Sequence, residues 1–202
     1  MDAALRAGIA VYDAGHHHAA HDAWESVWLA LDDGSDDERF LHGLIQFTAA
    51  VYHARRRNWS GATGLATSAR EYLTGLPDDY RGVNVGAVRQ WLGGLAADPE
   101  RIERARPLEL TYCGEAPSLD GLDFEAAAVA AVVLAEREGY DESVVDDAAA
   151  YAREELGTAK SRFVSLLLDF VGDAERRPLV YDRLRRHVER RRQPDADVEG
   201  LF

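Results

Sequence analysis

Cysteine and lysine are almost absent from this chain of 202 residues. Cys113 is the only cysteine and Lys160 the only lysine. A single cysteine excludes an intrachain disulfide and any zinc cluster built on several thiolates. As a nucleophile Cys113 would need a base beside it, and the neighbouring sequence offers none, so we expect a buried or idle thiol.

Long hydrophobic runs are also missing. No stretch approaches the roughly 18 consecutive apolar residues that a membrane-spanning helix needs. The N-terminal residues lack a cationic start followed by a long apolar core and a cleavage site, which a secretory leader would have. We therefore expect a soluble cytoplasmic protein with no membrane partner.

Positive charge is scarce compared with negative charge. The chain has 36 acidic and 23 basic residues, which gives a net charge of −13. A poly-anionic surface repels nucleic acid, so we expect nucleic acid to be an unlikely partner. Concentrated salt screens self-repulsion between acidic groups, and the composition therefore indicates a halophilic, haloarchaeal-type protein.

The sequence has no strand pattern longer than "LELTY" and no internal repeat, whereas apolar residues recur at helical spacing along most of its length. We therefore predict an all-α fold. The N-terminal helices are expected at residues 2–14, 18–31, 36–58, 60–75 and in a segment that begins after Asn84, which we expect to cap it. Small residues in 60–75 should let a neighbouring backbone approach closely; they are Gly61, Ala62, Gly64, Ala66 and Ala69.

Prolines and turn-forming residues concentrate between the predicted helical regions. This pattern predicts a helical bundle over residues 1–105, a linker over 106–122 and an additional helical portion over 123–202. In the last part we expect Gly139 to end one helix, Asp141 to cap the next and Thr158 to cap the one after.

Polar side chains interrupt the apolar pattern of the helix predicted at 18–31. His21 and Glu25 are one helical turn apart and so share a stripe, and Trp24 and Trp28 lie on the adjoining apolar face. The His–Glu pair should therefore lie at the rim of the core. The three histidines before it, residues 16–18, could add ligands to a site there, but we expect them in a solvated turn.

The helix predicted at 36–58 is apolar on almost every side except for one stripe. That stripe contains His42, Gln46 and His53. A short turn between the two helices makes them antiparallel neighbours, so His21 and Glu25 should face Gln46 and His53 across a groove. Leaving such groups buried and unpaired would cost about 1–3 kcal/mol each, so each needs a partner.

Two interpretations of these polar groups stay open. In the first they form a network that only specifies packing, as in a structural or interaction module. In the second they line a pocket in which Glu25 is a general base, with His21 or His53 as its catalytic partner. Gln46, Trp24, Trp28 and His42 would then bind a small polar substrate for hydrolysis, and a divalent metal could be held by His21, Glu25 and His53.

Taken together, "AHDAWESVW", "FLHGLIQFTAAVYH" and "NWSGATGL" resemble the signature of an uncharacterised helical family of prokaryotes, catalogued as domain of unknown function 309. The resemblance covers roughly residues 8–95. It implies a compact helical fold and no established activity, so it supplies no catalytic residues. The family usually has Glu where this chain has Asp22. The signature positions are His21, Asp22, Trp24, Glu25, Trp28, Gly43, Leu44, Ile45, Gln46, His53, Gly61 and Ala62.

The last predicted helix is rich in arginine, from Arg176 to Arg192, within an otherwise acidic chain. These cations either pair with acidic groups of the same molecule or dock an RNA or another acidic partner. High salt would weaken such docking steeply. The sequence leaves open whether the chain is a monomer or a homo-oligomer.

Overall fold

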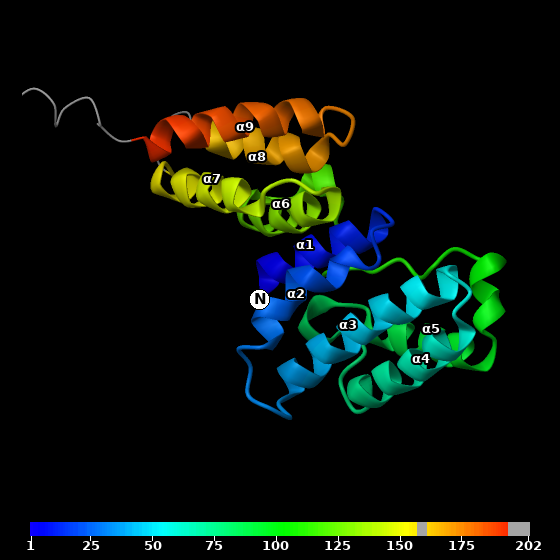
Figure 1. Cartoon of the computed structure of the whole chain (residues 1–202). Helices are drawn as coiled ribbons and strands as arrows, with labels where there is room; N and C mark the ends of the chain where they lie inside the picture. The colour runs from blue at the N-terminus through cyan, green and yellow to red at the C-terminus, as the bar shows by residue number, and fades with distance from the viewer. Residues whose placement is uncertain (157–160, 194–202) are drawn as a thin grey trace, which may run out of the picture. The chain divides into compact units, whose positions relative to one another are not determined.

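The computed structural model describes residues 1–156 and 161–193, and its fold is all-α, as predicted (Figure 1). Within these residues the only β-type pairing is a pair of isolated bridges around Tyr112. The chain divides into two compact units, Met1–Leu119 and Asp120–Phe202. The division falls inside the segment expected as a linker; the predicted limits of that linker stay a prediction.

The first unit is built from five α-helices joined by short turns and 3-10 segments. Ser35 and Asn58 accept hydrogen bonds from Glu38 N–H and Gly61 N–H, and so cap two of the helices at the sequence positions where capping residues are favoured. The core of the unit contains large apolar side chains of these helices that are fully buried, such as Leu5 and Phe47. The helices are α1 (Asp2–Asp13), α2 (Asp22–Trp28), α3 (Asp36–Arg55), α4 (Trp59–Leu73) and α5 (Val85–Ala97).

The helices α3 and α4 approach closely at Gly43. A Cβ placed on Gly43 would lie 2.6 Å from the Cγ and Cδ2 atoms of Leu73. The small-residue pattern of α4 is used only in part, because Ala62 and Ala66 are buried whereas a Cβ on Gly64 would meet open space. The glycine that permits the close approach is thus on α3, which corrects the expectation for Gly64.

An irregular segment, residues 106–111 (the strap), returns to the start of the chain. Leu110 N–H donates to Asp13 Oδ1 over 3.1 Å. Asn84 Nδ2 donates to Glu109 O over 3.1 Å, and Asn84 Oδ1 accepts from Thr111 N–H over 3.0 Å. Asn84 precedes α5 as predicted, but its side chain ties down the strap and does not cap the helix.

The second unit contains four α-helices within the residues described: α6 (Phe124–Glu138), α7 (Glu142–Glu154), α8 (Arg162–Gly172) and α9 (Arg177–Arg192). Gly139 ends α6 with a φ of 75°, and Asp141 caps α7 through Ser143 N–H, so both predictions are confirmed. Thr158 lies outside the described residues. The cap of α8 is Ser161, which accepts from Val164 N–H.

Arginines of α9 pair with acids of the same unit. Arg177 is 2% exposed; its guanidinium binds Glu138 and donates from Nε to Phe170 O over 2.8 Å. Arg191 binds Glu154 over 2.7 Å and also Glu155, and Arg192 binds Asp147 over 2.5 Å. These contacts favour intramolecular pairing over docking of an acidic partner. None of the described helices is long and apolar enough to cross a bilayer.

Candidate functional site

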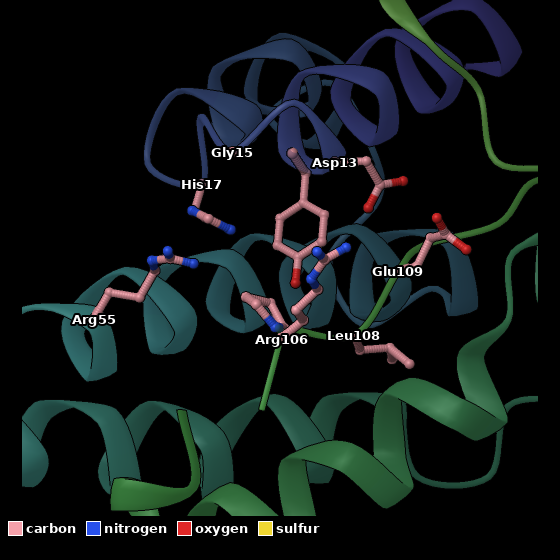
Figure 2. Close-up of a pocket in the computed structure, with 9 residues that line it drawn as sticks. Asp13, Gly15, His17, Arg55, Arg106, Leu108 and Glu109 are labelled. Atoms are coloured by element: carbon pink, nitrogen blue, oxygen red, sulfur yellow. The ribbon is translucent and has the colours of Figure 1, made fainter. Parts of the chain in front are cut away.

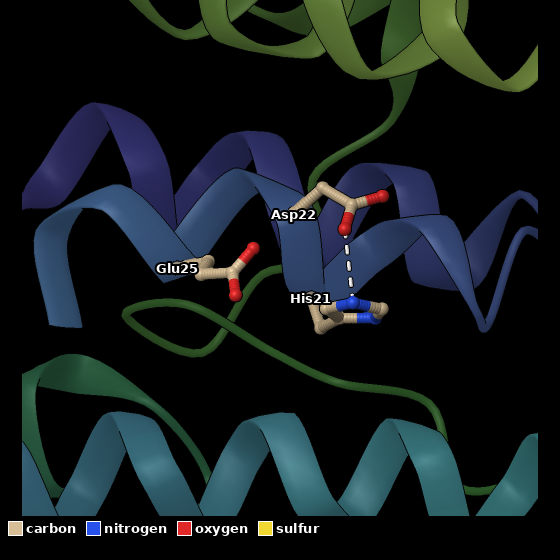
Figure 3. Close-up of side chains that lie close together, drawn as sticks. All are labelled: His21, Asp22 and Glu25. Atoms are coloured by element: carbon tan, nitrogen blue, oxygen red, sulfur yellow. Dashed lines mark ion pairs between the residues drawn. The ribbon is translucent and has the colours of Figure 1, made fainter. Parts of the chain in front are cut away.

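His21 and Glu25, predicted as a pair, lie together at the start of α2 (Figure 3). His21 Nε2 is 2.9 Å from Asp22 Oδ1, and this hydrogen bond raises the pKa of His21. One ligand atom from each of His21, Asp22 and Glu25 lies within 4.8 Å of the others. His21 and Asp22 are half-buried, whereas Glu25 is exposed. The pair therefore lies at the rim of the first unit, with Glu25 exposed to water.

Gln46 and His42 belong to a second network, on α3. Gln46 Nε2 is 3.0 Å from His42 Nε2, and His42 Nδ1 is 3.2 Å from Glu38 Oε1. Trp28 Nε1 donates to the same Glu38 oxygen over 2.8 Å. Burial alone would raise the pKa of Glu38, but the bonds from Trp28 and His42 outweigh it and lower that pKa. The carboxylate facing this stripe is thus Glu38, which the sequence did not single out.

His53 belongs to a third set of contacts, at the end of α3. Its Nδ1 lies 2.8 Å from Asn58 Nδ2. Among the described residues, no hydrogen bond or ion pair joins His53 or Gln46 to His21 or Glu25. The four side chains expected to meet are therefore divided among three local networks. Trp24 is buried in the core, where its Nε1 donates to Ala4 O over 3.0 Å.

A pocket that the sequence did not indicate lies between the end of α1, the end of α3 and the strap (Figure 2). We call it the α1 pocket. It encloses about 330 Å³, a size at the lower end of the usual range for small-ligand sites. Its lining residues are Tyr12, Asp13, Gly15, His17, Arg55, Arg106, Pro107, Leu108 and Glu109.

Tyr12 carries a buried hydroxyl without a partner. The residue is 1% exposed, and no hydrogen bond to its hydroxyl is formed by any described residue. Burial, reinforced by the charge of Asp13, raises the pKa of Tyr12, so the phenol stays protonated and can donate. An unsatisfied buried hydroxyl costs about 1–3 kcal/mol, which a ligand oxygen or a water at this position would recover.

Asp13 follows Tyr12 and joins the pocket to the strap. The pKa of its carboxyl is raised to about 7, because loss of hydration and the charge of Glu109 together outweigh the hydrogen bond from Leu110 N–H. At neutral pH this carboxyl is therefore close to its own pKa and can take up or release a proton.

His17 is buried against the Tyr12 ring, which corrects the expectation of a solvated turn. The residue is 8% exposed, and the two ring centroids are 5.0 Å apart in an edge-on arrangement. Burial, together with the neighbouring charge of Arg55, lowers the pKa of His17 to about 4. Gly15, with a φ of 89°, supplies the left-handed turn that lets the chain fold back after α1.

Arg55 and Arg106 supply positive charge to the α1 pocket. Both residues are exposed, and neither forms an ion pair with a residue in the described part of the chain. Arg55 comes from the last turn of α3 and Arg106 from the strap, so residues about fifty positions apart contribute to one rim. The site thus combines two arginines, two carboxyl groups (Asp13 and Glu109), a neutral imidazole and a buried hydroxyl donor.

Residues 5–65 match the model of a family described as a domain of unknown function, DUF309. An uncharacterized protein of Aquifex aeolicus (strain VF5) is 26% identical over 101 residues, which cover 50% of this chain and 29% of that relative. The resemblance inferred from the signature is confirmed over this segment. The DUF309 match includes Tyr12, Asp13, His17 and Arg55, whereas Arg106 on the strap lies outside it.

Proposed function

We propose that the first unit is a binding module that holds a small carboxylate ligand in the α1 pocket. The observation that carries this proposal is the buried hydroxyl of Tyr12 in a pocket that also contains two arginines; none of the three has a hydrogen-bond or ion-pair partner for these groups among the described residues. Buried polar groups in folded proteins are almost always satisfied, so an orphan donor beside free cations marks a place for an acceptor.

The chemistry of the lining favours a carboxylate over a phosphate. A guanidinium can bind a carboxylate through two parallel hydrogen bonds. A phosphate carries nearly two negative charges at neutral pH, and the carboxyl groups of Asp13 and Glu109 in the same pocket would repel it more strongly than a monoanion. Neutral His17 contributes a hydrogen-bonding group without adding another cation.

Calorimetric titration of the full chain with 4-methylpentanoate tests the proposal. Tyr12→Phe and Arg106→Gln should each weaken binding by about 10- to 100-fold, because each removes a donor to a charged ligand. Arg183→Gln is the matched control; Arg183 is an exposed residue of α9 with no ion pair in the described structure. No binding by the wild-type chain, or equal affinity in all variants, would refute the proposal.

A separate observation supports a second function, the hydrolase hypothesis centred on Glu25. We propose that His21, Asp22 and Glu25 bind a divalent cation, because one ligand atom from each lies within 4.8 Å of the others. Imidazole and carboxylate together suit zinc or manganese. Asp22 takes the place expected for His53, whose Nδ1 contacts Asn58. One carboxylate oxygen of Glu25 would bind the cation, and the other, exposed to water, would act as the general base for hydrolysis of a small polar substrate.

Titration with Zn²⁺ and with Mn²⁺ tests this second function. Glu25→Gln should weaken binding of the cation at least tenfold, because a neutral amide is a poorer ligand than a carboxylate. Glu100→Gln, an exposed carboxylate elsewhere in the first unit, is the control. If Glu25→Gln and His53→Asn change only stability and leave cation binding intact, the polar residues serve packing alone, as in the structural-module alternative.

A further inference from the structure

We infer that the ligand of the α1 pocket is a zwitterion, an α-amino acid with an apolar side chain, whose ammonium group binds at Asp13 and Glu109. This inference rests on the proposed function and adds the class of ligand. Positively and negatively charged side chains line opposite ends of the α1 pocket. Only a ligand that carries both charges can pair with both ends.

The charges of the pocket are separated in space. Figure 2 shows the side chains of His17 and Arg55 at one end of the group and the carboxyls of Asp13 and Glu109 at the other. The electrostatic neighbours agree with this separation: Arg55 acts on His17, whereas Glu109 acts on Asp13. Arg106 lies between the two ends in this view.

A ligand with a carboxylate alone would satisfy only one end. Asp13 and Glu109 repel each other, and neither forms an ion pair with a described residue. An ammonium group carries three donors and one positive charge, so it can bind both carboxyl groups and remove their repulsion. An α-amino acid carries both charged groups in one small molecule, and a pocket of about 330 Å³ is large enough to hold it.

A second hollow of about 300 Å³ shares Asp13 and Glu109 with the α1 pocket. Its other lining residues are mostly small and apolar: Ala10, Ala14, Ala116, Pro117, Ser118 and Leu119. A ligand whose ammonium lies at the two shared carboxyl groups can therefore place an aliphatic side chain in this hollow. Burial of that side chain would add a hydrophobic contribution to the binding.

The protonation state of Asp13 supplies an independent test for the bound ammonium group. Its pKa of about 7 falls when an ammonium group is bound beside it, so binding of the zwitterion at pH 7 should release a proton. A carboxylate without an amine should release none. Both ligands face the same other charged and titratable groups of the site. These groups are Tyr12, His17, Arg55, Arg106 and Glu109.

The test compares leucine with 4-methylpentanoate, which lacks only the amine, by calorimetry of the full chain in buffers of different ionisation enthalpy. Leucine should bind at least tenfold more tightly and release a proton at pH 7. In Asp13→Asn with Glu109→Gln this preference should vanish while 4-methylpentanoate still binds. Asparagine keeps an oxygen for Leu110 N–H, so the strap stays attached. Glu109→Gln alone serves if the double variant fails to fold, and Glu100→Gln is the control.

The outcomes separate the two proposals. Equal affinity for leucine and 4-methylpentanoate overturns the zwitterion and leaves the carboxylate site standing. A leucine preference that persists without the two carboxyl groups overturns their role. If neither compound binds, the proposed function falls and this inference falls with it.

Discussion

Asp13 and His17 are four positions apart on the wall of the α1 pocket, and folding shifts their pKa values in opposite directions. The pKa of Asp13 rises from 3.8 to about 7, so the folded state favours its protonated form and loses stability as the pH rises through that window. The pKa of His17 falls from 6.5 to about 4, so the folded state favours its neutral form and loses stability as the pH falls through that window. The two effects oppose each other between about pH 4 and 6.5.

Single substitutions should therefore reveal two pH dependences of the free energy of unfolding that oppose each other in the wild-type chain. In Asp13→Asn the free energy of unfolding should rise from pH 4 to 6.5 relative to the wild-type chain, because the opposing contribution of Asp13 is removed and that of His17 is left. In His17→Gln it should fall from pH 4 to 7 relative to the wild-type chain, because the opposing contribution of His17 is removed and that of Asp13 is left. Urea unfolding at a series of pH values measures both. Parallel pH profiles for the two variants would contradict the prediction.

Tyr12→Phe separates stability from binding at the same site. The substitution removes a buried hydroxyl that has no partner and keeps the ring that packs on His17 and Phe47. We expect the free energy of unfolding to stay equal or to rise, by up to about 1 kcal/mol, since an unsatisfied group is lost. Chemical denaturation without ligand measures it. A loss of more than about 1 kcal/mol would show that the hydroxyl is satisfied in solution.

The neighbours of a polar side chain could be predicted from the sequence only where they lie close along the same helix. The approach of His21 to Glu25 follows from one turn of helix. His17 could not be placed, because a run of three histidines resembles a solvated turn until the left-handed Gly15 folds it back onto Tyr12. The spacing of Glu38 and His42 by one helical turn was open to prediction, whereas the contact of Glu38 with Trp28 was not, because Trp28 lies across the turn between helices.

At the scale of the helices, Gly43 and Gly64 form a matched pair. Gly43→Ala would force the new methyl against Leu73, at 2.6 Å, and should cost about 1–3 kcal/mol of stability through strain between α3 and α4. Gly64→Ala meets open space on α4 and should gain about 0.5–1 kcal/mol, because alanine favours a helix over glycine. Thermal or urea unfolding measures both changes; a gain for Gly43→Ala would mean that the two helices are not tightly packed.

The existence of the helices was readable from apolar periodicity and capping residues, and their ends agree within a few positions. The side-chain hydrogen bonds between different elements could not be predicted from the sequence. Asn84 has the sequence position of a cap, yet its side chain is recruited by Glu109 and Thr111, about 25 residues away. A long-range hydrogen bond of this kind leaves no periodic trace in the sequence.

At the scale of the whole chain, the net charge of −13 predicts a response to salt. Mobile ions screen repulsion among surface acids, so the melting temperature should rise between about 0.1 M and about 2 M KCl. Scanning calorimetry measures this shift. A melting temperature that falls with added KCl would show that screened ion pairs, such as Arg153 with Glu125, matter more than the net repulsion.

The division of the chain between residues 119 and 120 predicts that a fragment of residues 1–119 folds alone, since it contains its own core and the whole α1 pocket. Circular dichroism should show a helical, cooperatively melting fragment, and the fragment should bind 4-methylpentanoate as the full chain does. A fragment that melts without cooperativity would show that the first unit depends on the second.

The hydrogen bond from Leu110 to Asp13 joins residues that are 97 positions apart. Closing so long a loop is entropically costly and is favoured only after the intervening helices have formed. During synthesis, therefore, a nascent chain that has already built α1 to α4 still lacks one wall of its binding site. A ligand that needs this wall would therefore bind finished copies of the unit and not truncated ones.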